Sequence, residues 1–309
     1  IISQISKNKK SSDFEKSLAE FMLSKIEKKK RNYTTEIKYL KNYHSLCFNS
    51  NFELNSQSEF YYDKIISRFY NKIQFNNFSD KNNFSNIKPI FIIGLPRSGS
   101  TLIETILTSS EKKLKTCGES NVFNMCIVEN IREKIFSRNF NINEETLYID
   151  HLKICKNIKK KYKSLNILEN DFFLDKSLEN FFNIEVILKI IPNAKFIHSF
   201  RNYNDAIISI YQSSLHELSW SHKISSLTKY VDNYLKIINF FKKKYKNKIL
   251  DVKLEDLTKS QESVFKNIFN FCSLKWDKKF LDLKMRKNSF VKTLSGVQVR
   301  KKISKYDLK

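Results

Sequence analysis

The sequence is poor in glycine, proline and tryptophan and contains no long apolar run. Its 309 residues include four Gly, three Pro and two Trp. A membrane-spanning helix needs about 20 consecutive apolar residues, and no such stretch occurs, so we expect no membrane span. Residues 1–12 are polar and rich in lysine, unlike a secretory signal peptide. We therefore expect a cytoplasmic protein, and the absence of an initiator Met predicts that the true start is missing.

The cysteines are few and show no metal-binding or disulfide pattern. Their number is odd, and none forms a Cys-x-x-Cys pair. Disulfide frameworks and structural zinc sites both use paired cysteines, so we expect reduced thiols and no bound metal. The five are Cys47, Cys117, Cys126, Cys155 and Cys272.

Acidic residues are scarce beside basic ones, with 32 Asp and Glu against 56 Lys and Arg, for a net charge of +24. Two interpretations are open: a polyanionic partner such as nucleic acid, or a composition rich in Lys, Asn and Ile. No nucleic-acid-binding motif is present, so we favour the second and expect no nucleic-acid partner. The lysine-rich runs at 28–31 and 242–248 are then solvated helix surfaces.

The first 75 residues carry helical periodicity. Apolar residues recur at helical spacing in two stripes within residues 13–50, separated by a polar bend near residues 30–35. This pattern predicts a helix hairpin, followed by a further helix near 59–72. The stretch 76–88 is rich in Asn and Ser and aperiodic, which predicts a linker. We therefore divide the chain into a helical extension (1–75), a linker (76–88) and a second domain (89–309).

In the second domain, short apolar runs alternate with helical segments. The predicted strands are 89–93, 172–174, 195–200 and 249–254. The predicted helices are 99–109, 120–134, 143–164, 180–190, 205–215, 222–245 and 261–272. This alternation predicts an α/β fold with a P-loop-like parallel sheet and helices on both of its faces. Ligands of such sheets bind beyond the carboxyl ends of the strands.

Two of the four glycines flank one loop between the first predicted strand and its helix. The loop is Gly94-Leu95-Pro96-Arg97-Ser98-Gly99-Ser100-Thr101, with the glycine spacing of a phosphate-binding P-loop. Backbone N–H groups in such a turn converge on an anion at a helix N-terminus. Ser98, Ser100 and Thr101 add hydroxyl donors, and Arg97 adds a charged planar fork.

Position 100 departs from the pattern of nucleoside triphosphatases, which place a Lys there. Without that Lys the loop suits a single 5′-phosphate carrying a sulfate better than a triphosphate with magnesium. A P-loop kinase or triphosphatase stays open as the alternative function, with Asp175 as the nearest acidic strand end for a magnesium ion. A basic nucleic-acid-binding scaffold with a degenerate loop is a third possibility.

Residues 89–101 resemble the 5′-phosphosulfate loop of sulfotransferases that use 3′-phosphoadenosine 5′-phosphosulfate (PAPS). The resemblance is closest to the branch of protein-tyrosine sulfotransferases and bacterial enzymes with N-terminal tetratricopeptide repeats. It implies transfer of a sulfuryl group from PAPS to an acceptor nucleophile, with adenosine 3′,5′-bisphosphate as product. Gly94, Pro96 and Gly99 join the charged and hydroxyl residues of the loop as expected cofactor-binding positions. The family usually has Thr where this chain has Ser100.

A second motif lies at the end of the third predicted strand. Arg201 ends that strand, and Ser209 follows eight residues later on a helix that we expect Asp205 to cap. This spacing resembles the family motif whose Arg and Ser hold the 3′-phosphate. The family often has Asp-Pro after the Arg, whereas this chain has Asn202-Tyr203.

The same resemblance gives three residues catalytic roles. Glu119, after Gly118, resembles the Glu that serves as general base in the tyrosine sulfotransferase branch; a Glu stabilised by a helix N-terminus is its alternative. Lys176 resembles a strand-end Lys that stabilises the bridging oxygen, with a solvated Lys as its alternative. Ser295 resembles a C-terminal Ser that contacts the phosphosulfate.

Other polar and aromatic residues are expected to be structural. His198 is the alternative base, because other sulfotransferase branches use a His, but its place inside a strand favours a core role. Tyr230 and Tyr234 have the spacing of core residues rather than of adenine-stacking ones, and Trp276 is expected to pack.

The resemblance also covers the chain ends and the substrates. The 13–50 hairpin looks like the last repeat of a longer tetratricopeptide array. Family members usually continue past the equivalent of Lys309 with a basic residue and a Trp, so we expect a trimmed C-terminus. Protein tyrosine, a carbohydrate and a small molecule all stay open as the acceptor, as does the oligomeric state.

Overall fold

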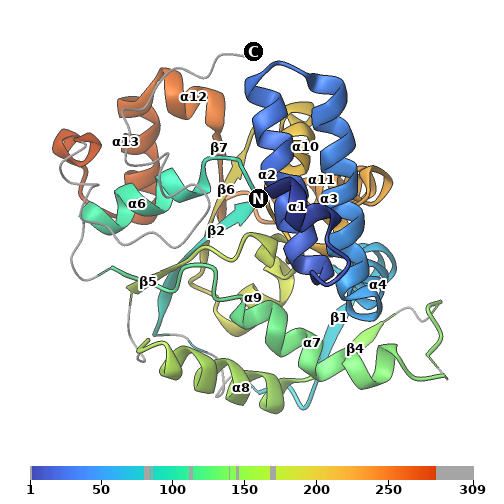
Figure 1. The fold of residues 1–309 in the computed structure, drawn as a ribbon. Coiled ribbons are helices and arrows are strands. Elements are labelled where there is room, and N and C mark those ends of the chain that lie inside the picture. Colours follow the sequence, from blue (N-terminus) through green and yellow to red (C-terminus); the bar gives the residue numbers. More distant parts are fainter. Residues whose placement is uncertain are drawn as a thin grey trace. The chain divides into compact units, whose positions relative to one another are not determined.

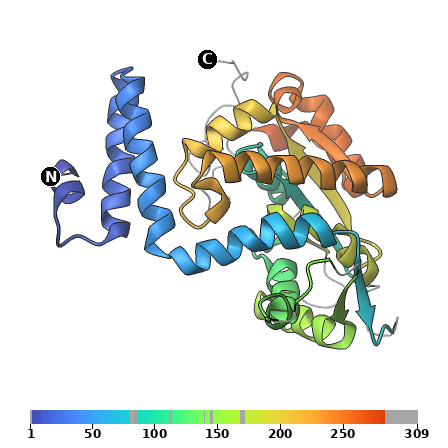
Figure 2. The ribbon, with the colours of Figure 1, turned by 90° about the vertical axis from the view of Figure 1, so that its right-hand side faces the viewer.

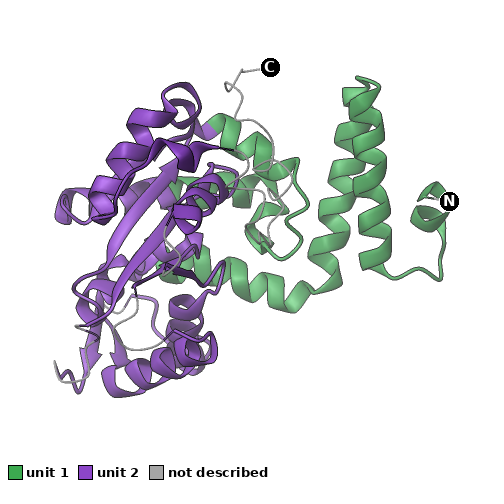
Figure 3. Ribbon diagram, turned by 90° about the vertical axis from the view of Figure 1, so that its left-hand side faces the viewer, with its two compact units in different colours: residues 1–67, 204–233 green, residues 68–203, 234–309 purple. Residues whose placement is uncertain are grey.

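The computed structural model describes residues 2–79, 84, 86–110, 114–138, 140–143, 146–167 and 172–282 (Figures 1 and 2). Its contacts divide into two compact units (Figure 3). Unit 1 contains residues 1–67 and 204–233, and unit 2 contains residues 68–203 and 234–309. A segment from the middle of the predicted α/β region therefore clusters with the N-terminal helices. None of the described helices is long and apolar enough to cross a bilayer.

Unit 1 begins with the predicted helix hairpin, which is confirmed. Helices α2 (Asp13–Lys29) and α3 (Tyr33–Ser50) lie side by side after the short α1 (Ile2–Lys7) (Figure 2). Ser12 and Glu15 form a capping box at the start of α2, and the Asn32 side chain caps α3. These caps satisfy N–H groups that have no partner inside the helix.

The apolar stripe predicted on α2 does not form its buried face. The stripe consists of Leu18, Phe21, Met22 and Ile26: Met22 is 54% exposed, Leu18 and Ile26 are also exposed, and Phe21 is half-buried. The face that α2 buries instead carries Ser17, Ala19, Glu20 and Ser24. Helical spacing identified the helix correctly, but spacing alone does not show which face packs against the chain's own neighbours.

The rest of unit 1 is helical. It contains α4 (Phe52–Phe60), the π-helical η1 (Tyr61–Ile66), most of α10 (Tyr203–Tyr211), η4 (Ser219–Ser221) and the first part of α11 (Ile224–Lys244). Trp220 and Tyr230 stack with their ring centroids 3.8 Å apart. Tyr230 is buried, so its prediction as a core residue is confirmed. Asp205 lies in the first turn of α10, which begins at Tyr203 rather than at an Asp205 cap.

In unit 2, the described residues form a parallel sheet of five strands in the order β3-β5-β2-β6-β7 (Figure 1). The strands are β2 (Lys88–Gly94), β3 (Lys115–Thr116), β5 (Phe172–Asp175), β6 (Lys195–Phe200) and β7 (Ile249–Lys253). The four predicted strands are all present. The two-residue β3 was missed because both of its residues are exposed and polar.

Helices cover both faces of this sheet, as predicted. Side chains of successive strand residues point to opposite faces. One face packs Ile92 and Ile197 against α6 (Ser100–Ser110), α12 (Leu254–Lys259) and α13 (Gln261–Cys272). The other face carries Phe91 and Phe196, whose rings stack 5.3 Å apart. The helices α7 (Val122–Ile135), α8 (His151–Ser164) and α9 (Ile184–Ile190) and the second part of α11 also belong to this unit.

Smaller elements complete unit 2. The short η3 (Leu178–Phe182) follows β5, and η5 (Lys278–Leu281) follows α13. The Trp276 ring contacts Phe269 edge to face at 5.0 Å, which confirms its predicted packing role.

A second, two-stranded parallel sheet lies outside the sequence prediction. It pairs β1 (Ile73–Asn76) with β4 (Leu147–Asp150). The single helix predicted over 143–164 is wrong at its start, because β4 occupies 147–150 and α8 begins only at His151. Asp150 caps α8 by accepting a hydrogen bond from the N–H of Lys153 at 2.8 Å. Four residues are too few for the strand period to compete with the longer helical pattern.

The core on the α6 side of the sheet predicts that alanine substitutions at two leucines lower the free energy of unfolding by very different amounts. Leu107 on α6 is fully buried, whereas Leu152 on α8 is 48% exposed. We expect Leu107→Ala to lower the free energy of unfolding by about 2–5 kcal/mol. The matched variant Leu152→Ala should change it by only about 0.5 kcal/mol. Denaturant unfolding measures both, and equal losses would contradict this assignment of the core.

Candidate functional site

The loop 94–101 connects β2 to α6 through an unusual backbone path. Gly94 and Gly99 have φ angles of 138° and 91°, and Arg97 has a φ of 67°. Positive φ is common for glycine but rare for a residue with a side chain. Strained backbone of this kind persists where surrounding contacts enforce it, and it is concentrated at functional sites.

The end of β6 supplies those contacts. A Cβ on Gly94 would lie 2.1 Å from the carbonyl oxygen of Ser199, so only glycine fits there. The Ser199 hydroxyl donates a hydrogen bond to the carbonyl of Ser98 at 2.7 Å. Arg201, just after β6, donates from Nη1 to the carbonyl of Arg97 at 3.2 Å. Arg201 of the second motif is therefore in direct contact with the loop of the first motif.

This contact places two guanidinium-bearing residues beside each other. Arg97 is half-buried and Arg201 is 8% exposed. Burial lowers the pKa of Arg97, and the positive charge of Arg201 lowers it further. Two adjacent cations repel each other, and an anion between them would turn that repulsion into attraction.

The serine and threonine hydroxyls of the loop differ in their surroundings. The hydroxyl of Ser98 donates to the carbonyl of Leu95 at 2.7 Å and so stabilises the turn itself. Ser100 and Thr101 are buried in the first turn of α6. N–H groups in the first turn of a helix have no intrahelical acceptor and favour a bound anion.

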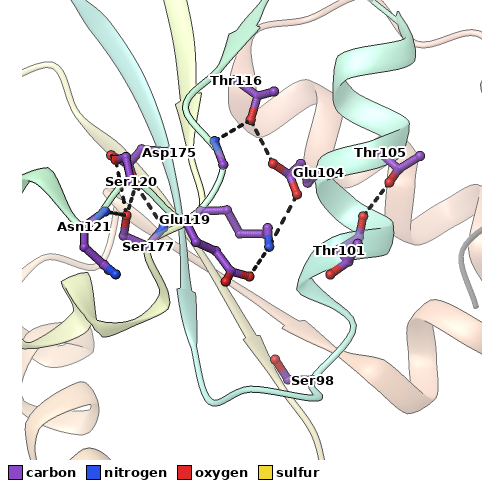
Figure 4. Close-up of polar contacts among 12 residues, drawn as sticks. Ser98, Thr101, Glu104, Thr105, Thr116, Glu119, Ser120, Asn121, Asp175 and Ser177 are labelled. Carbon is purple, nitrogen blue, oxygen red and sulfur yellow. Dashed lines mark hydrogen bonds and ion pairs between the residues drawn. The ribbon is translucent and has the colours of Figure 1, made fainter. Parts of the chain in front are cut away.

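Beside the loop, at the ends of β3 and β5, one lysine lies between two carboxylates (Figure 4). The Nζ of Lys176 is 2.5 Å from Glu119 Oε1 and 3.5 Å from Glu104 Oε2. The Lys176 side chain is completely buried, whereas that of Glu119 is 51% exposed. The strand order β3-β5-β2 brings Glu119, Lys176 and loop 94–101 to the same edge of the sheet.

A buried carboxylate fixes this region from behind. Asp175 accepts hydrogen bonds from the Ser177 backbone, from the hydroxyls of Ser177 and Ser120, and from Tyr162. Burial raises the pKa of Asp175, although the bonds from Ser177, Ser120 and Tyr162 act in the opposite direction. The N–H of Asn121 in turn donates to the Ser177 hydroxyl at 2.7 Å (Figure 4). Asp175 is therefore used to hold the chain around Glu119, which argues against its use as a magnesium ligand.

His198 has a structural role, as its position in the strand predicted. Its Nδ1 is 2.7 Å from Asp251 Oδ1, and its Nε2 contacts the hydroxyl of Tyr234. Burial lowers the pKa of His198, although Asp251 opposes this shift. Both ring nitrogens of His198 are thus engaged inside the protein, and Tyr234 is fully buried beside it. The prediction that Tyr234 is a core residue is confirmed.

Two predicted site residues are not part of the site as the structure describes it in unit 2. Ser209 is a half-buried residue of α10 in unit 1, and its carbonyl accepts a hydrogen bond from Ser213 at 2.6 Å. Ser295 lies outside the described residues. Pro96 lies within loop 94–101, next to Arg97. Across the described part of the chain, no group of three or more His, Cys, Asp or Glu side chains is placed to hold a metal ion.

Glu104 and the supporting role of Asp175 were not predicted from the sequence. Glu104 is a single charged residue on α6, whose other side chains are apolar or hydroxylic, and it is only 8% exposed. A lone carboxylate on a helix that otherwise reads as buried is a usable signal, because an ionised group is rarely buried without a partner.

Most of the chain matches a known protein family. Residues 89–278, more than half of the sequence, match the model of the sulfotransferase family. An uncharacterized protein of Aquifex aeolicus (strain VF5) is 28% identical over 227 residues, which cover 70% of this chain and 29% of that protein. The chain thus spans less than a third of the length of this curated relative.

Solved structures of sulfotransferases also match. The sulfotransferase domain of the Synechococcus PCC 7002 olefin synthase has 18% identity and a TM-score of 0.43, over 76% of this chain and 100% of that domain. Sulfotransferase STF1 of Mycobacterium tuberculosis H37Rv has 10% identity and a TM-score of 0.43, over 92% of this chain and 87% of that protein.

The contact between loop 94–101 and β6 predicts that two glycines respond differently to the same substitution. Gly94→Ala adds a methyl group 2.1 Å from the Ser199 carbonyl at a φ of 138°. We expect it to lower the free energy of unfolding by about 3 kcal/mol or more. Gly118→Ala, at a φ of 57° with no neighbour within 4 Å of the added Cβ, should cost only about 1–2 kcal/mol. Denaturant unfolding compares them, and a mild effect at Gly94 would disprove the contact.

Proposed function

The chain belongs to the sulfotransferase family, and we propose that it transfers the sulfuryl group of PAPS to an acceptor hydroxyl or phenol. The observation that carries this proposal is the meeting of two motifs at one sheet edge. Loop 94–101 and Arg201 form a cationic site there, and Glu119 and Lys176 lie at the adjacent strand ends. Transfer from a nucleotide with negative charge at both its 3′ and 5′ ends requires cations that bind it, and the acceptor requires a group that takes its proton.

The residues present fit the nucleotide. In the expected cradle for the 5′-phosphosulfate, a Cβ at Gly94 would clash with the backbone of Ser199, and Gly99 has a φ of 91°, which favours glycine. Arg97 would supply the charge for the 5′-phosphosulfate, and Arg201 would bind the 3′-phosphate. Ser209 is proposed as a ligand of the 3′-phosphate from the family spacing alone. Pro96, Ser98, Ser100 and Thr101 complete the proposed binding set. We propose that no metal takes part.

When bound, PAPS supplies a sulfuryl group attached to a phosphate that can leave. During transfer the bond from sulfur to the phosphate oxygen breaks, and a bond from sulfur to the acceptor oxygen forms. Glu119 would take the proton of the acceptor, because its half-exposed carboxylate can reach a group outside the protein. Lys176 would stabilise the negative charge that develops on the leaving oxygen. Ser295 is proposed to contact the same group.

Two features make a kinase or triphosphatase the weaker proposal. Loop 94–101 has Ser100 where a triphosphatase loop needs Lys. Asp175, the acidic strand end considered for magnesium, is fully buried and accepts hydrogen bonds from neighbouring hydroxyls.

A transfer assay identifies the acceptor. Radiolabelled PAPS incubated separately with a tyrosine peptide, a carbohydrate and small phenols should label one of these classes. Labelling of none of them, with magnesium-dependent ATP hydrolysis instead, would overturn the proposal.

Binding of adenosine 3′,5′-bisphosphate should depend on both arginines. A charge-assisted hydrogen bond contributes about 1.5–3 kcal/mol, so Arg97→Ala and Arg201→Ala should each weaken binding by roughly 10- to 150-fold. Isothermal titration calorimetry measures this loss. The exposed Arg138 on the same unit gives the matched control, since Arg138→Ala removes one positive charge without touching the site. Equal affinities for all three variants would show that the nucleotide binds elsewhere.

Turnover should depend on Glu119 without affecting nucleotide binding. A positioned general base contributes about 10²–10⁴-fold to rate, so Glu119→Gln should lower kcat by that factor. The affinity for adenosine 3′,5′-bisphosphate should stay within about twofold, since no binding role is assigned to Glu119. A PAPS-dependent transfer assay and calorimetry on the same variant check the two halves. If kcat stays high, another residue is the base.

A further inference from the structure

Lys176 has two carboxylate partners, which differ in how far their side chains are exposed to solvent. The side chain of Lys176 has no exposed surface, so its ammonium group must be compensated inside the protein. Glu119 is 51% exposed on its side chain, whereas Glu104 is 10% exposed. One partner can therefore move into the solvent-facing site, while the other stays fixed.

Glu104 is fixed by a chain of hydrogen bonds (Figure 4). Its Oε1 accepts a hydrogen bond from the Thr116 hydroxyl at 2.8 Å, and its Oε2 lies 3.5 Å from Lys176 Nζ. The Thr116 hydroxyl in turn accepts from the N–H of Gly118 at 3.0 Å. Glu104 thus ties α6, which begins at loop 94–101, to the backbone immediately before Glu119.

The proposed reaction removes one of the two negative charges beside Lys176. Once Glu119 takes the acceptor proton it is neutral, and it no longer compensates the charge of Lys176. A buried ammonium group left without a counter-ion is costly and tends to lose its proton. Glu104 is then the protein carboxylate that remains beside Lys176, with its Oε2 3.5 Å from Nζ.

We propose that Glu104 is a positioning residue that keeps Lys176 charged and in place while Glu119 takes the acceptor proton. The inference rests on the proposed roles of Glu119 and Lys176. Glu104 is a poor base itself, because one of its oxygens accepts from Thr116 and the other faces Lys176. The fixed carboxylate of Glu104 thus compensates Lys176, and the movable carboxylate of Glu119 takes the acceptor proton.

The first test is the pH profile of Glu104→Gln. This change removes one negative charge beside the ammonium group of Lys176, and it removes a like charge near Glu119. The acidic and the basic limb of the plot of kcat/KM against pH should therefore both move to lower pH by about one unit. The value of kcat should fall roughly 10- to 100-fold. A residue with only a structural role would lower kcat without moving the limbs.

Two matched variants control this test. Glu104→Asp keeps the charge and should return both limbs to their original pH, with kcat partly restored. Glu129→Gln removes a carboxylate from an exposed ion pair with Lys161 on α7 and α8, and it should leave the profile unchanged. If Glu129→Gln shifts the limbs as Glu104→Gln does, the effect comes from net charge and the proposal is wrong.

The second test does not involve turnover. Thermal unfolding of Glu104→Gln, Lys176→Met and the double variant forms a double-mutant cycle. If Glu104 compensates Lys176, Glu104→Gln should lower Tm by several degrees in the native background and by much less where residue 176 is already Met. Equal Tm losses in the two backgrounds would show that the two groups are not coupled, and would overturn the inference.

The outcomes separate this inference from the proposed function. If Glu119→Gln abolishes turnover while Glu104→Gln leaves the pH limbs in place, Glu119 stands as the base and Glu104 has no positioning role. If Glu119→Gln keeps full turnover while the unfolding cycle shows coupling, Glu104 compensates Lys176 but the proposed base is wrong. Support for the whole inference requires loss of turnover in Glu119→Gln, shifted limbs in Glu104→Gln and coupling in the cycle.

Discussion

The contact between the end of β6 and loop 94–101 is the constraint on which the site depends. Gly94 packs against the Ser199 carbonyl so closely that no side chain fits. The Ser199 hydroxyl and the Arg201 guanidinium both donate to carbonyls of the loop. A backbone with positive φ at Arg97 is unfavourable in isolation, so these contacts are what hold the arginine in place. The same contacts join the two cationic groups that we assign to opposite ends of one nucleotide.

The strand order determines what lies next to this constraint. Because β5 is the neighbour of β2 and β3 is the neighbour of β5, Lys176 and Glu119 reach the same edge as the loop. Parallel strands end together, so short loops from four segments of the chain can share one site. The Lys176 side chain in this group is completely buried and lies between the carboxylates of Glu119 and Glu104.

Part of this could be predicted from the sequence. The strands rich in Ile and Phe, the glycine spacing of loop 94–101 and the strand-end Arg201 are local patterns, and the structure has them where the sequence indicated. Glu104 could not be assigned a role, because its partners Thr116 and Lys176 are distant along the chain and meet only through the sheet. The exposure of the apolar stripe on α2 and the pairing of β1 with β4 were not predicted for the same reason. Local spacing does not specify which face of a helix is buried or which strands pair.

The most direct test of the central claim is a crystal structure of the protein with adenosine 3′,5′-bisphosphate. We expect the 5′-phosphate to lie in loop 94–101 against the backbone of Gly99 and Ser100, with the 3′-phosphate within hydrogen-bonding distance of Arg201. A nucleotide bound outside this edge of the sheet, or one whose 5′-phosphate does not touch the loop, would contradict it.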